Sequence, residues 1–181
     1  TDLSTLGGKT AGTVTVSNAV DISGTPAEVT AALVTAETKV EVTDATVTIT
    51  GNPSISELNA IAAETTGVVT ATLAAASLSS LGSLSTASTD NITITVNDAP
   101  NTGVTATDLS TLGGKTAGTV TVSNAVDISG TPAEVTAALV TAETKVEVTD
   151  ATVTITGNPS ISELNAIAAE TTGVVTATLA A

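Results

Sequence analysis

Residues 20–33 read Val-Asp-Ile-Ser-Gly-Thr-Pro-Ala-Glu-Val-Thr-Ala-Ala-Leu and combine a strand, a turn and the start of a helix. The alternating Val and Ile are typical of a half-buried strand, and Gly24 permits the turn that ends it. Thr25 lies at the N-cap position, with proline at N1 and Glu28 at N3, so side chains satisfy the first amides of a helix. The stretch predicts a strand followed at once by a helix.

A second unit of the same kind lies downstream. Residues 45–51 alternate Val and Ile with Thr and end in glycine, and Ser54 with Glu57 repeats the capping box, with Asn52-Pro53 as a competing start. Apolar residues at helical spacing then predict narrow buried stripes. The stripes are Val29, Leu33 and Ala36 in the first helix and Ile55, Leu58 and Ile61 in the second.

Shorter alternating stretches give the chain a regular spacing. They are residues 13–16, 39–42, 68–71 and 91–94, with 119–122 opening the next round, at steps of 26, 29, 23 and 28 residues. We interpret each as a strand with Val or Ile inward and Thr outward. Two further leucine clusters, Leu3/Leu6 and Leu78/Leu81/Leu84, are interrupted by Gly7-Gly8 and Gly82, and predict helices of one turn or of 3₁₀ type.

The steps make up a 106-residue period that is repeated letter for letter. Thr1–Ala75 reappears as Thr107–Ala181 in the 181-residue chain. The first full repeat, 1–106, divides into segments 1–24, 25–51, 52–76 and 77–106, and the partial second repeat, 107–181, is identical to 1–75. Exact repetition is typical of repeat proteins, in which each copy can contact the next through the same surface. We expect a segment of a longer repetitive polypeptide.

Strand and helix alternating at about 26 residues force successive strands to run parallel and return the chain one layer along a stack. The predicted fold is one continuous right-handed α/β solenoid, with each segment forming a coil that carries one short helix. With strands about 4.8 Å apart, a period would advance by roughly 19 Å. Two all-β alternatives stay open, a β-helix and a tandem β-sandwich.

Composition agrees with a thin core. Aromatic residues, Met, Cys and His are all absent, so Val, Ile, Leu and Ala must fill the interior. The net charge is −14, from 18 acidic residues and 4 basic ones, which disfavours nucleic acid as a partner. No apolar run approaches the roughly 18 residues of a membrane span, so no membrane insertion is expected. An acidic surface is typical of a secreted or cell-surface protein.

Three stretches carry a family resemblance. Residues 1–16 (Thr-Asp-Leu-Ser-Thr-Leu-Gly-Gly-Lys-Thr-Ala-Gly-Thr-Val-Thr-Val), 20–33 and 57–72 (Glu-Leu-Asn-Ala-Ile-Ala-Ala-Glu-Thr-Thr-Gly-Val-Val-Thr-Ala-Thr) resemble repeats of giant secreted and cell-surface proteins of marine cyanobacteria and related bacteria. The resemblance implies an extracellular repetitive protein, often exported by a type I route. It carries over no catalytic or binding residue.

A second resemblance concerns calcium. Ile-Thr-Val-Asn-Asp-Ala-Pro-Asn (94–101) is similar to the ending of cadherin-like adhesin modules, whose linkers often bind calcium. Calcium needs six to eight oxygen ligands gathered closely. The candidate donors are Asn97, Asp98, Asp90, Asp21 and Asp44. Asx turns at corners are the simpler interpretation, and no metal ligand or cofactor is assigned.

Other motifs are weaker. Gly7-Gly8-Lys9-Thr10 resembles the tail of a phosphate-binding loop but lacks the earlier glycine, so a glycine turn with a solvated lysine is expected. Asn91-Ile92-Thr93 is a glycosylation triplet inside a predicted strand. Without His or Cys, no acidic residue has the context of a catalytic base, so no enzymatic activity and no catalytic residue are predicted.

The expected function is structural. The sequence predicts a repeat segment of an extracellular fibre, a sheath or a long adhesin stalk at the cell surface, with itself as partner, as a homopolymer associating head to tail or a long tandem array. The alternative is a calcium-dependent binding module of cadherin-like type. An ice- or mineral-binding face is disfavoured because the threonines form no strict column across all four segments.

Overall fold

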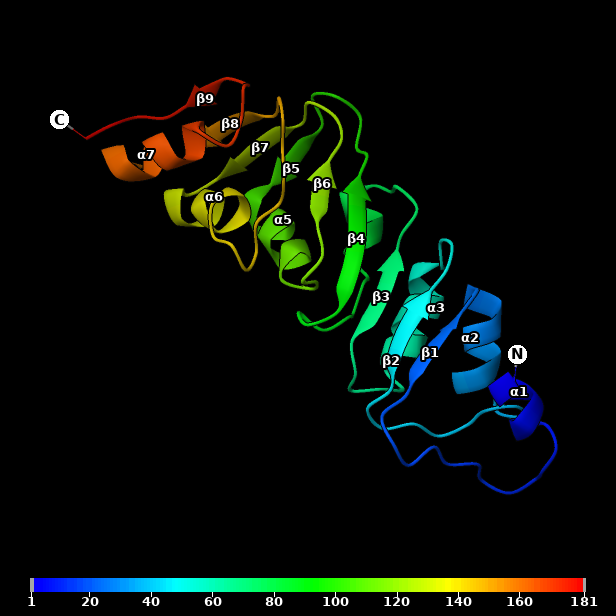
Figure 1. The fold of residues 1–181 in the computed structure, drawn as a ribbon. Coiled ribbons are helices and arrows are strands. Elements are labelled where there is room, and N and C mark those ends of the chain that lie inside the picture. The colour runs from blue at the N-terminus through cyan, green and yellow to red at the C-terminus, as the bar shows by residue number, and fades with distance from the viewer. Residues whose placement is uncertain (1, 181) are drawn as a thin grey trace. The chain divides into compact units, whose positions relative to one another are not determined.

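The computed structural model describes residues 2–180, in which strands alternate with short helices (Figure 1). Every strand pair within these residues is parallel, and the strands lie in two sheets with helices between them. This confirms the α/β class with parallel strands. The all-β alternatives are wrong, because capped helices separate the strands and the pairing is parallel.

The chain divides into two compact units. The first comprises residues up to 74 together with 84–93, and the second comprises 75–83 and the residues from 94 onward. The division falls inside the fourth segment, 77–106, within strand β4 (Asn91–Val96).

The first unit pairs its strands in chain order. Ile22 lies opposite Val47, and Val47 opposite Val69, before residues 91–93 of β4 join the far edge. A short helix precedes or follows each strand. The elements are α1 (Asp2–Gly7), β1 (Asp21–Gly24), α2 (Pro26–Leu33), β2 (Thr46–Ile49), α3 (Ile55–Ala62) and β3 (Val69–Thr72).

The second unit contains two groups of paired strands. Residues 94–96 of β4 pair with β6, while β5, β7, β8 and β9 pair in that order. Val104, Ile128 and Val153 lie in one register column. The elements are α4 (Leu78–Leu81), β5 (Gly103–Thr105), α5 (Ala106–Gly113), β6 (Val120–Val122), β7 (Asp127–Gly130), α6 (Pro132–Leu139), β8 (Thr152–Ile155), α7 (Ile161–Ala168) and β9 (Val175–Thr176).

Both predicted capping boxes are confirmed. Thr25 caps α2 and accepts the Glu28 amide, while the Glu28 carboxylate accepts the Thr25 amide at 2.9 Å. Ser54 and Glu57 do the same at α3, and both arrangements recur in the second copy. Gly51 has φ 97°, a left-handed conformation that glycine adopts without strain before α3. Local sequence therefore fixes where these helices begin.

The core contains the residues expected from the alternation. In β2 and β4 the Val and Ile side chains are buried while the first threonines are exposed. Val29 and Leu33 are buried on α2, as are Leu58 and Ile61 on α3. The predicted stripe was wrong at its end, because α2 stops at Leu33 and Ala36 is exposed in the following loop.

Two predicted strands are reduced to a single bridge. Residues 13–16 and 39–42 meet only at Thr15 and Glu41, although both stretches alternate as a strand should. The amide of Val40 instead donates to the Ala32 carbonyl at 2.8 Å, which draws this stretch toward α2. The regular strands lie just downstream, at β1 and β2.

The helix prediction for the first leucine cluster was also wrong. Residues 2–7 form an α-helix and not a single turn, and their copy forms the eight-residue α5. Gly7 is compatible with the helix because it is the last residue of α1. The one-turn prediction is confirmed for Leu78–Leu81, which Gly82 ends as C-cap.

Polar bonds join neighbouring segments within each unit. The Thr65 hydroxyl donates to the Ala45 carbonyl at 2.6 Å, and Lys39 pairs with Glu64 at 2.7 Å. The second copy repeats both contacts at the same distances. Threonine hydroxyls thus bond main-chain carbonyls of the preceding segment, which satisfies groups that the short strands leave unpaired.

The capping glutamates predict an acid-sensitive contribution to stability. Hydrogen bonds lower the pKa of Glu28 and Glu57 below 4.5, chiefly from the Thr25 amide and the Ser54 hydroxyl respectively. A lowered folded-state pKa contributes stability that is present above about pH 4.5 and is lost as the pH falls through the lowered value. We therefore expect Glu57→Gln, which retains the cap, to flatten the fall in urea midpoint between pH 5 and pH 3. An unchanged pH dependence would contradict this.

Candidate functional site

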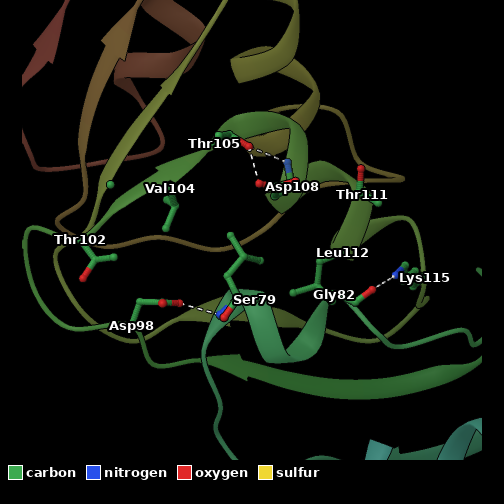
Figure 2. A pocket seen from close by; sticks show the side chains of 12 residues that line it. Ser79, Gly82, Asp98, Thr102, Val104, Thr105, Asp108, Thr111, Leu112 and Lys115 are labelled. Carbon is green, nitrogen blue, oxygen red and sulfur yellow. Dashed lines mark hydrogen bonds between the residues drawn. The ribbon is translucent and has the colours of Figure 1, made fainter.

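A pocket lies beside α4 and α5 in the second unit, where α4 is a single turn (Figure 2). Its volume is about 550 Å³. Leu78, Val104 and Leu112 supply buried apolar surface, whereas the rim is polar. The polar lining residues are Ser79, Asp98, Thr102, Thr105, Asp108, Thr111 and Lys115.

The charged groups of this pocket already have partners in the protein. The Asp98 carboxylate accepts the Leu78 amide at 2.7 Å, at the start of α4. The Lys115 ammonium donates to the Gly82 carbonyl at 2.8 Å, at the end of the same helix. Thr105 donates to the Asp108 carboxylate at 2.8 Å (Figure 2). The first two bonds fix the two ends of α4, and the third caps the start of α5, so all three have a structural role.

Two of the other candidate calcium donors, Asp90 and Asp21, have hydrogen-bond partners of their own within the protein. Both Asp90 carboxylate oxygens accept main-chain amides, from Val69 and Ala87, each at 2.8 Å, and its side chain is buried. Asp21 accepts the Thr46 hydroxyl, and Asp44 lies in an exposed bend. Asp98 alone lies at the pocket. Within residues 2–180, no group of three or more His, Cys, Asp or Glu could hold a metal.

The two copies of Gly-Gly-Lys-Thr lie at helix ends. Gly7 ends α1, and Lys9 is exposed in the turn that follows. In the second copy Lys115 is half-buried and bonded to Gly82, so only Lys9 has the exposed position that the sequence predicted. The Asn91 side chain of the glycosylation triplet is exposed on β4.

Identical residues of the two copies differ in burial. In the first unit Leu58 and Leu73 of the third segment are 0% and 5% exposed. Their copies Leu164 and Leu179 are half-buried and 49% exposed. The surface formed by α7, β9 and the residues up to 180 is hereafter the open face. In the first copy residues 91–93 pair with β3, and the given 181-residue sequence contains no second copy of that stretch.

Comparison with models of protein families, with curated proteins and with solved structures finds no match to this chain. Across residues 2–180, none of the helices has the length and apolar character needed to cross a membrane.

Proposed function

We propose that this chain is a structural repeat segment in which successive α/β segments stack as coils of a solenoid. The proposal is supported by the strand registers, which advance by 21 to 26 residues from each strand to its parallel neighbour. One residue column thus recurs once per segment. Stacked aliphatic layers of this kind give stiffness along one direction.

The observation that carries the proposal is the repetition of contacts along with sequence. Asp21 pairs with Thr46 in the first unit, and Asp127 pairs with Thr152 in the second, in the same register. The ion pair Lys39–Glu64 and its copy Lys145–Glu170 both measure 2.7 Å. These contacts between neighbouring segments therefore recur in both copies, which is the property an extendable array requires.

We infer that the array serves as a fibre, sheath or long adhesin stalk outside the cell or on its surface. Repetition supplies length, and the net charge of −14 keeps like surfaces apart. The charged groups of the pocket are occupied by structural bonds, which favours a mechanical role over a catalytic one.

Electron microscopy of chains with two, four and six periods tests the stacking. The length should grow linearly by about 19 Å per period if neighbouring strands are about 4.8 Å apart. An increment of about 30–40 Å would indicate a string of separate domains and would overturn the proposal. A second arm compares thermal unfolding with and without EDTA. An unchanged transition is expected, whereas a lower one would favour the calcium-dependent module.

A further inference from the structure

The strands of the first unit carry polar side chains on the side that faces away from the helices. Helices α2 and α3 lie on the other side of β1, β2 and β3, where the Val and Ile side chains are buried (Figure 1). The outward side chains are aligned from strand to strand, because the parallel pairing continues in one register. One column of directly opposed residues consists of Ser23, Thr48, Thr70 and Asn91.

This column passes through all four segments of the first repeat. The sequence alone disfavours an ice-binding face, because threonine does not recur at one position in every segment. The register shows that each segment nevertheless supplies an uncharged hydroxyl or amide group to the same column. The second unit contains a column of the same kind, which consists of Thr105, Ser129, Thr154 and Thr176.

A second column lies beside the first one in the first unit. Thr72 lies opposite Thr93, and Thr50 follows β2, where its amide donates to the Gly24 carbonyl at 2.8 Å. Neighbouring strands are about 4.8 Å apart, and two residues along a strand span about 6.7 Å, so the two columns form a two-dimensional array. We call this array the hydroxyl face, and its residues are Ser23, Thr48, Thr50, Thr70, Thr72, Asn91 and Thr93.

The side chains of the hydroxyl face are available to water. Elsewhere in the first unit, Thr38 and Thr65 donate to main-chain carbonyls at 2.6 Å, and Thr46 donates to Asp21. Within residues 2–180, no hydrogen bond of this kind engages a side chain of the hydroxyl face. Thr70 is half-buried and the other members are exposed. Each hydroxyl can therefore donate to one water molecule and accept from another.

The hydroxyl face carries no charge, although the whole chain has a net charge of −14. A charged side chain would hold its own hydration shell and would disturb a regular layer of water. The chain also lacks the aromatic rings that usually hold a flat carbohydrate surface. A neutral and regular surface of water molecules therefore fits this face better than a polysaccharide does.

We propose that the hydroxyl face binds the surface of ice. Both spacings of the array are close to distances between oxygen atoms on an ice surface, so waters bonded to the face lie where they continue the crystal. Chains bound in this way stop the growth of the crystal beneath them, which lowers the freezing temperature below the melting temperature. This inference uses only the pairing within each unit and does not depend on the proposed fibre, sheath or stalk.

Seeded ice crystals in a solution of the full 181-residue chain test the proposal. We expect faceted crystals and a gap between their melting and freezing temperatures. Replacing the central threonine of both columns, Thr48→Tyr with Thr154→Tyr, should abolish the gap, because each ring projects from the array. Tyrosine is a good strand former, so the fold should be retained, and an unchanged urea midpoint checks this.

Ser56→Tyr with Ser162→Tyr is the matched control. These serines are exposed counterparts on α3 and α7, outside the hydroxyl face, so the gap should be unchanged. Round crystals without a gap in the original chain would overturn the proposal. A gap that survives in the threonine variant, or that is lost equally in the serine variant, would also overturn it. Sedimentation with microcrystalline cellulose, without any effect on ice, would show that the face binds carbohydrate and that the proposal is wrong.

Discussion

Leu58→Ala is expected to lower the free energy of unfolding by about 2–5 kcal/mol, the usual cost of deleting a fully buried leucine side chain. Leu58 is 0% exposed on α3, where the neighbouring segments enclose it. This loss of stability has two parts. The favourable free energy of removing the side chain's methyl groups from water is lost, and a cavity is left that the close-packed interior does not fill.

Leu164→Ala is the matched control within the same chain. Its sequence context is identical, but its side chain is half-buried on the open face, so we expect a loss of about 1 kcal/mol. Urea unfolding followed by circular dichroism, with hydrogen exchange of α3 and α7, measures the pair. Equal losses would show that the open face is covered in solution. In that case the cost at Leu164 should fall on dilution.

The parts of the fold that the sequence predicted are those that depend on adjacent residues. The capping box of Thr25 and Glu28 needs only a threonine, a proline and a glutamate at fixed spacing, and it forms in both copies. The strands β1 and β2 likewise follow from alternation that ends in glycine. In each case the hydrogen-bond partners lie within a few residues.

Local sequence does not decide whether residues 13–16 and their copy 119–122 form a strand. The sequences are identical, yet only the second copy contains a regular strand, β6. β6 has β4 on one side and a bridge to Glu147 on the other, whereas Thr15 has only its bridge to Glu41. Strand formation here is decided by a partner far away in sequence, which propensity does not report.

The candidate site was also predictable from the sequence only in part. Asp98 was one of five candidate oxygen donors near predicted strand ends, and it lies at the pocket. Its actual partner, the amide at the start of α4, is 20 residues away in sequence and was not predictable from spacing. The strand β5 beside it was missed because its short stretch carries no alternation.

Gly113→Ala is the other substitution with a large expected effect, a loss of about 3 kcal/mol from overpacking. A Cβ at Gly113 would lie 2.1 Å from the Thr144 carbonyl oxygen and 2.6 Å from its carbon. These are main-chain atoms that cannot rotate away. The Thr144 hydroxyl is bonded to Ala137 at 2.5 Å, and the Val146 amide to Ala138 at 2.7 Å, so the loop is fixed to α6 on both sides.

Gly114→Ala provides the adjacent control. Its nearest neighbour would be the Ser110 carbonyl oxygen at 3.5 Å, and its φ of −68° suits any residue. Alanine there should be neutral or stabilising by about 0.4–1 kcal/mol, through the less flexible unfolded chain. Urea unfolding of both variants measures the difference. If Gly113→Ala were as stable as Gly114→Ala, the loop carrying Thr144 would have to move away from α5. Gly113 would then be needed only for the turn after α5, and not for the close approach of two segments.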